Sequence, residues 1–365
     1  MVSSISQNTS SSYPYSTTKR VLVTGGSGLV GSALKRFLKK SQFQYLTVIY
    51  DFNEEHFNHN QNDEIISSKH DLWVFLKSSD GNLCDKTDTN RIFSYIQPTH
   101  VIHLAARVGG LLRNLREPLE MFEENLQMNL NVLHACHEFN VQYALMIGST
   151  CTFPDPCPHP ITELMLHDGA PHSSNYGYAY AKRMLEIHCR LYREQYGRQY
   201  TCLLPTNLYG SQDNFSLEDG HVIPALIQRA WISSQEDTKN CLEVHGDGQD
   251  TRQFLYDDDF AIILFQLITY DPSCCLPSSI IIAPPKSHEI KISFVAEYIA
   301  SKFNLPGVSY LEKPDERGQR CKTVSSQLLQ SIIGHGFHYT SITEGLGNVI
   351  TNYLESKMNG NSVKK

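Results

Sequence analysis

The stretch Lys19–Lys40, KRVLVTGGSGLVGSALKRFLKK, predicts the fold of the first part of the chain. A run of apolar, mostly β-branched residues ends at Thr24, glycines follow at positions 25, 28 and 31, and an apolar and basic helix pattern comes next. Such a turn lets backbone amides and a helix N-terminus approach a pyrophosphate. We therefore predict a dinucleotide-binding turn made by Gly25, Gly28, Leu29, Val30 and Gly31.

Two further segments have the composition of buried parallel strands. Val101–Leu104 is followed by the small residues Ala105 and Ala106, beside which a cofactor can pass, so we expect Leu104 and both alanines to contact it. Tyr143–Thr150, YALMIGST, is a similar strand that ends in hydroxyl side chains. The pattern favours the α/β class, with a Rossmann-type doubly wound parallel sheet and a smaller, mostly C-terminal α/β substrate domain.

The length of the chain predicts more than one domain. A chain of 365 residues exceeds what one hydrophobic core usually fills, so a large domain and a smaller one are expected. The positions of the motifs predict these bounds: a disordered leader 1–18, a Rossmann domain 19–207 to which 242–275 returns, a substrate-binding domain 208–241 and 276–358, and a loose tail 359–365.

The charge, the hydropathy and the cysteines of the chain argue against several classes of protein. A net charge of −7 argues against a general nucleic-acid binder, and no apolar run approaches the ~20 residues that a membrane helix needs. The N-terminus lacks the apolar core of a secretory signal, and the ten cysteines are scattered. We therefore expect free thiols in a reducing, cytoplasmic compartment. The cluster of Cys151, Cys157 and His159 has wide, proline-rich spacing, so we predict no metal site.

Two segments compete for the place of the second strand. The strand-like YLTVIY leads to Asp51, 20 residues past the last glycine of the turn, where an NAD enzyme places its ribose-binding acid. The segment LWVFL ends instead before Lys77 and Ser78, which suit a 2′-phosphate. The polar, asparagine-rich stretch between the two resembles an inserted loop. We favour Trp73–Leu76 as the second strand, and hence NADP as the cofactor.

The segment NYGYAYAKRM, residues 175–184, places three tyrosines close to a lysine. It begins an amphipathic helix pattern, and on a helix only residues three or four apart share a face. Tyr178 stands four residues before Lys182, so these two form the pair. An ammonium favours the phenolate form and would lower the pKa of the phenol. Ser149 closes a preceding strand and is placed to bind a substrate carbonyl.

These motifs resemble the extended branch of the short-chain dehydrogenase/reductase superfamily. Five segments are more closely similar to the GDP-L-fucose synthase family: GSTCTFP, YAYAK, PTNLYGSQDNF, DGHVIPALIQRA and GDGQDTRQFLYDDD. The resemblance implies a reductase triad of Ser149, Tyr178 and Lys182. It also implies that Cys151 and His221 are the proton-transfer pair of an epimerase.

The same resemblance extends to the ligands. It implies that the cofactor is also contacted by Lys182, Pro205, Asn207, Leu208 and His221. It implies that the nucleotide sugar is bound by Arg229, His245, Arg252 and Asp315. The family commonly has tryptophan in place of His245, and the polar insertion around residues 40–72 is a further departure. The family is dimeric, which implies a homodimer here.

The expected activity is NADPH-dependent conversion of GDP-4-keto-6-deoxy-D-mannose to GDP-L-fucose, by inversion at C3 and C5 and reduction of the C4 ketone. A thiol and an imidazole, with unperturbed pKa values of ~8.5 and ~6.5, suit proton removal and return. The sequence leaves open which of the two removes the proton. Alternatives are a nucleotide-sugar 4-epimerase or 4,6-dehydratase, or a non-catalytic NADP-binding module. Arg252 has a structural alternative as an ion-pair partner of the acids at 257–259.

Overall fold

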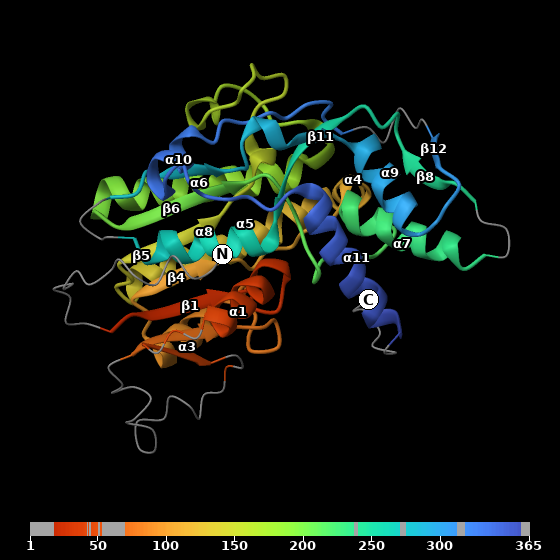
Figure 1. Cartoon of the computed structure of the whole chain (residues 1–365). Coiled ribbons are helices and arrows are strands. Elements are labelled where there is room, and N and C mark those ends of the chain that lie inside the picture. The colour runs from red at the N-terminus through yellow and green to blue at the C-terminus, as the bar shows by residue number, and fades with distance from the viewer. Residues whose placement is uncertain are drawn as a thin grey trace.

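The computed structural model describes residues 18–41, 43, 45–49, 52, 70–236, 240–270, 275–311 and 318–358. The predicted tail, all but the end of the predicted leader, most of the polar insertion, Asp51 and Asp315 lie outside the described residues. Figure 1 shows a large central sheet beside a smaller group of helices and short strands.

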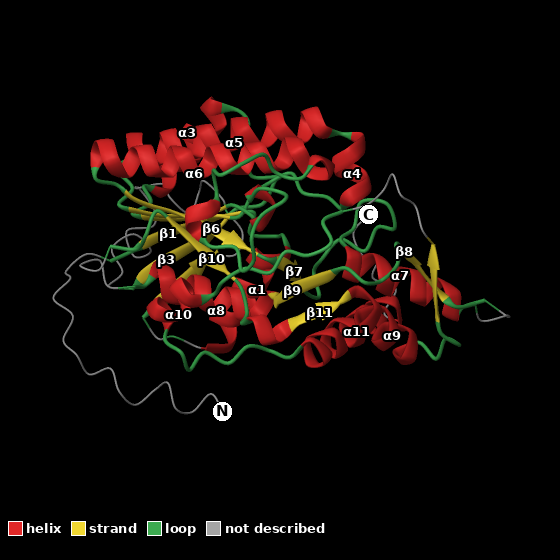
Figure 2. Cartoon of the chain, turned by 90° about the horizontal axis from the view of Figure 1, so that it is seen from above, coloured by secondary structure: helices red, strands yellow, loops and turns green. Residues whose placement is uncertain are grey.

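The large sheet has seven parallel strands in the order β10-β6-β5-β4-β1-β3-β2. Its strands are β1 (Arg20–Thr24), β2 (Leu46–Ile49), β3 (Asp71–Phe75), β4 (His100–His103), β5 (Tyr143–Ile147), β6 (Gln199–Pro205) and β10 (Ser279–Ile282). One face is covered by α3 (Lys86–Ile96), α5 (Pro118–Glu138) and α6 (Tyr176–Tyr196), and the other by α1 (Leu29–Ser41), α8 (Asp257–Ile268) and α10 (Gln327–Ile333) (Figure 2). The predicted doubly wound α/β class is confirmed.

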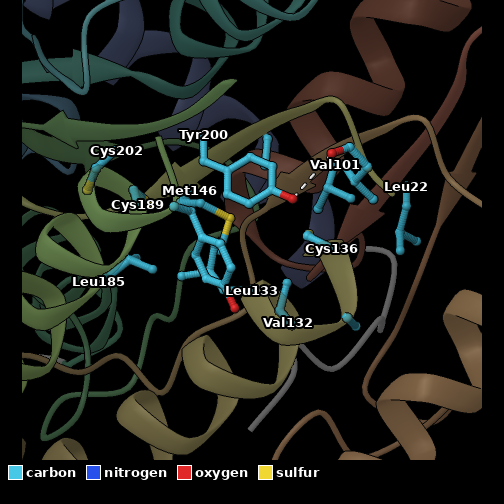
Figure 3. Close-up of a cluster of buried hydrophobic side chains, with 14 of the residues drawn as sticks. Leu22, Val101, Val132, Leu133, Cys136, Met146, Leu185, Cys189, Tyr200 and Cys202 are labelled. Carbon is cyan, nitrogen blue, oxygen red and sulfur yellow. Dashed lines mark hydrogen bonds between the residues drawn. The ribbon is translucent and has the colours of Figure 1, made fainter. Parts of the chain in front are cut away.

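Alternation along the buried strands explains the two layers of helices. In β1, Leu22 joins the core under α3, α5 and α6, whereas Val21 and Val23 join the core under α1 and α8. Successive side chains of a strand point to opposite faces, so a strand that is apolar throughout needs cover on both sides. Figure 3 shows part of the first core, where the Tyr200 hydroxyl donates to the Val141 carbonyl at 3.2 Å.

Both candidates for the second strand are strands. β3 pairs with β1, with Val21 opposite Trp73, whereas β2 pairs with β3 at the edge of the sheet. Residues 73–75 therefore lie beside the glycine turn, as predicted for the second strand. The Gly26 amide donates to the Leu76 carbonyl at 2.6 Å, which fixes the end of β3 against the turn.

A third core lies outside the large sheet. Its strands are β7 (Asn207–Tyr209), β8 (Leu242–His245), β9 (Thr251–Tyr256), β11 (Glu289–Lys291) and β12 (Val308–Leu311), in a β11-β9-β7 sheet and a β12-β8 pair. Its helices are α7 (Val222–Ser234), α9 (Ile292–Lys302) and α11 (Ile342–Met358). Short connecting helices are α4 (Leu111–Arg116), η2 (Thr150–Thr152), η3 (Glu163–Met165), η4 (Ser173–Asn175) and η5 (Lys286–His288).

The strand pairing bears on the predicted domain bounds. α8 packs against α1 on the large sheet. However, β8 pairs with β12 outside the large sheet, and β10 is hydrogen-bonded to β6 inside it. β10 follows residue 276 in the chain, α10 packs on the same sheet, and α11 belongs to the third core.

Candidate active site

A cavity of about 880 Å³ opens at the carboxyl ends of the strands. This is the edge at which parallel α/β sheets bind ligands, because strand ends and helix N-termini meet there. Every described residue that the sequence places in the site contributes to its wall: Gly25, Gly28, Leu29, Val30, Gly31, Lys77, Ser78, Leu104, Ala105, Ala106, Ser149, Cys151, Tyr178, Lys182, Pro205, Asn207, Leu208, His221, Arg229, His245 and Arg252. The structure brings them together, and their individual roles stay predictions.

The glycine turn has the geometry of a dinucleotide cradle. Gly25 has a φ of +67°, and a Cβ there would lie 2.8 Å from the amide nitrogen of Ala105. A Cβ on Gly31 would lie 2.6 Å from the Gly25 carbonyl oxygen, so the first turn of α1 packs directly on the turn. Only glycine permits both close approaches, which leave backbone amides at the N-terminus of α1 facing the cavity. The turn fits a pyrophosphate.

Lys77 and Ser78 follow β3 on the same wall. The Asp80 carboxylate accepts from the backbone amide of Lys77 at 2.7 Å, which holds this turn in place. An ammonium and a hydroxyl group at the end of the second strand suit a ribose 2′-phosphate, which a carboxylate would repel. The predicted preference for NADP fits this wall.

The three residues of the predicted triad come from β5 and α6. Ser149 is the N-cap of η2, two residues after β5 ends, and its hydroxyl oxygen accepts from the Cys151 amide at 3.1 Å. Lys182 is only 1% exposed, and its ammonium donates to the Ile147 carbonyl at 2.7 Å. The same nitrogen lies 5.8 Å from the centre of the Tyr178 ring. The helical spacing therefore does place Tyr178 and Lys182 on one face.

The ionisation of Tyr178 differs from the expectation. Burial, reinforced by the thiols of Cys151 and Cys202, raises the pKa of Tyr178 instead of lowering it. Burial also lowers the pKa of Lys182 to about 8. The physical reason is that burial removes the water that would stabilise the charged phenolate. The raised pKa favours the protonated phenol, which can donate a hydrogen bond.

Cys151 lies in η2, and the side chain of Arg183 holds η2 in place. That guanidinium donates to the Thr152 carbonyl at 3.0 Å and to the Gly169 carbonyl at 2.7 Å. Burial opposes ionisation of the Cys151 thiol, but Lys322, the Ser149 hydroxyl and Arg252 outweigh it and lower the pKa of Cys151. The net effect favours a thiolate.

His221 is the residue that precedes α7. Its Nδ1 lies 3.5 Å from an Asp213 carboxylate oxygen. Burial opposes protonation, but Asp213, with a further contribution from Cys151, outweighs it and raises the pKa of His221. A group with a lowered pKa and one with a raised pKa thus face one cavity. These directions of shift favour a thiolate at Cys151 and an imidazolium at His221.

Two residues of this arrangement were not predicted from the sequence. Lys322 donates from its ammonium to the Cys151 sulfur at 3.4 Å, across 171 residues of chain. Asp213 is the acid beside His221. Asp213 lies within a segment that carries the family resemblance, which was a usable signal. Nothing local distinguishes Lys322 from a surface lysine.

The far end of the cavity carries the predicted substrate residues. Arg252 donates to the Thr251 carbonyl at 2.7 Å and the Gln319 carbonyl at 2.6 Å, while Asp257 pairs with Arg36 at 2.9 Å. The alternative pairing of Arg252 is therefore not what the structure shows. Arg229 donates to the carbonyl of Glu243, and His245 lies 3.5 Å from the Glu243 carboxylate. The two arginines, Arg229 and Arg252, lie on the part of the wall that suits a diphosphate.

The described ranges hold no cluster of three or more histidine, cysteine or acidic side chains able to bind a metal ion. In the cysteine-rich loop, His159 contacts the Thr323 carbonyl at 3.1 Å, and the Cys157 sulfur lies 3.8 Å from the Met165 sulfur. None of the helices within the described ranges combines the length and the apolar character that crossing a bilayer requires.

A doubly wound sheet with a glycine turn after its first strand, and serine, tyrosine and lysine side chains at its strand ends, defines a short-chain dehydrogenase/reductase. Within that class, the chain belongs to the NAD dependent epimerase/dehydratase family, whose model matches residues 21–273.

Similar proteins are more specific. The chain is 40% identical over 319 residues to a GDP-L-fucose synthase from Dictyostelium discoideum, covering 87% of this chain and 90% of the relative. It is 34% identical to a probable GDP-L-fucose synthase from Drosophila melanogaster, covering 93% and 98%. It superposes with a TM-score of 0.78 on a GDP-L-fucose synthetase from Naegleria fowleri bound to NADP, at 34% identity, covering 96% and 98%.

Proposed function

We propose that this chain converts GDP-4-keto-6-deoxy-D-mannose to GDP-L-fucose, by inversion at C3 and C5 followed by NADPH-dependent reduction of the C4 ketone. The observation that carries the proposal is one cavity that holds a thiol–imidazole pair together with a serine–tyrosine–lysine set. Relatives at 40% and 34% identity over most of both chains carry the same activity in their names. A 4-epimerase or a 4,6-dehydratase needs no such thiol–imidazole pair.

The cofactor site is the glycine-turn end of the cavity. The amides of the turn would hold the pyrophosphate, Lys77 and Ser78 the 2′-phosphate, and Lys182 the nicotinamide ribose. When bound, NADPH supplies the hydride that reduces C4. Leu104, Ala105 and Ala106 are small or apolar, so they exclude water from this wall without blocking it.

Inversion requires that a proton leave one face of a carbon and return to the other. The C4 ketone acidifies the hydrogens at C3 and C5, so a base of moderate strength suffices. Cys151 removes the proton as a thiolate, because its pKa is lowered by Lys322, Ser149 and Arg252 despite burial. His221 returns a proton as an imidazolium, because Asp213 raises its pKa.

Charge develops on the C4 oxygen in each step. Ser149 lies at the end of β5, and Tyr178 lies in the first turn of α6. Their hydroxyl groups can donate to that oxygen where the charge appears. The raised pKa keeps Tyr178 protonated, so it also has the proton that the reduced C4 oxygen needs.

Incubation of the protein with NADPH and GDP-4-keto-6-deoxy-D-mannose tests the proposal. We expect oxidation of the cofactor together with GDP-L-fucose in the product. Oxidation that yields an uninverted 4-hydroxy sugar would leave only a reductase, and no oxidation would exclude the function. A Tyr178→Phe variant is the matched control, since it keeps the fold and removes the proton donor.

Cys151→Ser separates the two activities. A serine hydroxyl is too weak an acid to serve as the base, so proton exchange at C3 and C5 should fall by roughly 10²–10⁴-fold while NADPH binding is kept. Solvent deuterium in the recovered sugar measures the first, and cofactor fluorescence measures the second. Normal deuterium uptake in the variant would remove the epimerase assignment.

We also propose a homodimer and a cytoplasmic, reducing location. The dimer is supported by an apolar hollow on the outer face of α5 and α6, lined by Phe122, Leu126, Leu130, Met184, Ile187 and Leu191. The reducing location is supported by nine described cysteines that are all free thiols.

A further inference from the structure

Lys322 is an internal lysine rather than a surface one. It is 7% exposed, and its ammonium donates to the Cys151 sulfur at 3.4 Å. Burying an ammonium costs free energy unless an acceptor or a negative charge compensates it. Within the described residues, the Cys151 sulfur is the one hydrogen-bond acceptor that faces Lys322.

The backbone after Lys322 is tied down on two sides. The Ile161 amide donates to the Thr323 carbonyl at 2.9 Å, and the Ser325 amide donates to the Ile161 carbonyl at 2.8 Å. On the other side, the Val324 amide donates to the buried side chain of Gln253 at 2.7 Å. These hydrogen bonds anchor residues 323–325 to neighbouring segments of the fold. The anchored backbone therefore holds Lys322 at the cavity wall, beside the sulfur.

Other groups near the sulfur do not replace this contact. The Arg252 guanidinium contributes positive charge, but its hydrogen bonds go to the carbonyls of Thr251 and Gln319. The Ser149 hydroxyl accepts from the Cys151 backbone amide and also hydrogen-bonds the thiol, but it carries no charge. The acid of this region, Glu289, accepts from the Thr323 hydroxyl at 2.6 Å and the Thr251 hydroxyl at 3.1 Å. Lys322 is therefore the cation in direct contact with the thiol.

We propose that Lys322 is a positioning residue, which holds the Cys151 sulfur as a thiolate, aimed into the cavity, before substrate arrives. This proposal rests on the proposed function, in which Cys151 is the base. It explains how the Cys151 thiol is already ionised at neutral pH. No bond forms or breaks in this role. The thiol proton goes to solvent, and the ammonium neutralises the charge that remains.

The test measures Cys151 alone, without substrate. Alkylation of the Cys151 peptide by iodoacetamide is followed against pH by mass spectrometry in the full-length protein. In Lys322→Met we expect the midpoint of alkylation to move to higher pH, and the rate at neutral pH to fall on the order of tenfold. Lys322→Arg should keep the wild-type midpoint, because it keeps the charge. Lys86→Met is the control, since Lys86 is exposed on α3.

A second readout connects the thiolate to turnover. Deuterium uptake at C3 and C5 should show its acid limb at higher pH in Lys322→Met, and the wild-type limb in Lys322→Arg. An unchanged alkylation midpoint in Lys322→Met overturns the proposal, and a rise in KM alone would make Lys322 a substrate ligand. If Lys322→Met loses its fold, judged by NADPH binding, Lys322→Gln answers the same question. Because alkylation needs no substrate, a failure of the proposed function would leave this result readable.

Discussion

At the scale of single residues, the cysteines show how position sets reactivity. Cys136, Cys189 and Cys202 are buried in apolar surroundings, and burial raises the pKa of each. Burial acts on Cys151 in the same direction, yet Lys322, Ser149 and Arg252 reverse the outcome and lower its pKa. The same side-chain type therefore has a raised pKa in three places and a lowered one in the fourth. Near Cys189 and Cys202 the charges of Arg193 and Lys182 do not outweigh burial, whereas the groups around Cys151 do.

Asp213 gives a residue-scale prediction about pH. It raises the pKa of His221, and His221 must be protonated to act as an acid, so activity is lost as pH rises through that pKa. In Asp213→Asn the pKa of His221 falls, so the alkaline limb of deuterium exchange should move to lower pH. We expect about a tenfold loss on the alkaline side of neutrality and recovery at lower pH.

The control is Asp219→Asn in the same loop, where the carboxylate pairs with Arg116 at 2.9 Å rather than with His221. Its alkaline limb should coincide with that of the wild type. An unmoved limb in Asp213→Asn would show that His221 does not depend on this carboxylate.

At the scale of elements, the loop before α7 is held by the loop before α4. The Gly110 amide donates to the Asp219 carbonyl at 2.8 Å, and a Cβ on Gly110 would collide with the Gly220 carbonyl. His221 follows Gly220 directly, so this contact positions the imidazole. The two loops can approach this closely because Gly110 and Gly220, which lack side chains, meet at the contact.

Gly110→Ala should therefore displace His221. We expect deuterium exchange at C3 and C5 to fall by roughly ten- to a hundredfold, since small misplacements of a reacting group cost that much, while NADPH affinity changes little. Gly336→Ala is the matched control, because a Cβ there meets nothing within 4 Å. Equal loss of exchange and of cofactor binding would point to a general disturbance of the fold instead.

The elements also show what could be predicted from the sequence. The glycine turn, the strands that follow it and the pairing of Tyr178 with Lys182 depend on local spacing, and all three appear in the structure. The direction of the shift in the pKa of Tyr178 depends on how deeply the fold buries the phenol, which local spacing does not show. The contact of Lys322 with Cys151 joins segments 171 residues apart, so no local pattern could show it.

At the scale of the whole molecule, the outer face of α5 and α6 is the proposed dimer interface, and a substitution on it tests the dimer. The two helices pack side by side in the outer layer of Figure 2, and Leu191 on α6 is 51% exposed. An exposed apolar face of this kind is stabilised by covering it. Leu191→Glu should shift the protein from dimer to monomer in sedimentation at micromolar concentration, because it would bury a charge in the interface.

Leu164→Glu serves as the control for that experiment. Leu164 is 92% exposed on η3 and is not among the residues that line the hollow on α5 and α6, so its change should leave the oligomeric state as it is. A wild type that sediments as a monomer would exclude the dimer, and a Leu191→Glu dimer would place the interface on another face.

A buried histidine, His103, makes the stability of the whole fold depend on pH. His103 is fully buried between β1, β4 and α5, where its Nδ1 accepts from the Thr24 hydroxyl at 2.8 Å and its Nε2 donates to Asn129 Oδ1 at 3.2 Å. Burial, together with the charge of Lys182, lowers the pKa of His103 to about 3. The folded protein therefore holds a neutral ring that the unfolded chain protonates below about pH 6.5.

The direction in which stability changes with pH follows from the numbers of protons that the folded and the unfolded chain bind at His103. Between pH 6.5 and 3 the unfolded chain binds more protons at this site, so stability falls as pH falls. For one such histidine the loss between pH 7 and pH 5 is about 2 kcal/mol in the free energy of unfolding. In His103→Gln this loss is absent, so the destabilisation measured by urea unfolding at pH 7 should shrink by about 2 kcal/mol at pH 5. The exposed His335→Gln should show no such change. An equal cost of His103→Gln at both pH values would mean that the buried ring is protonated in the folded protein, and the hydrogen bonds that join β1, β4 and α5 at the glycine turn would then need a different assignment.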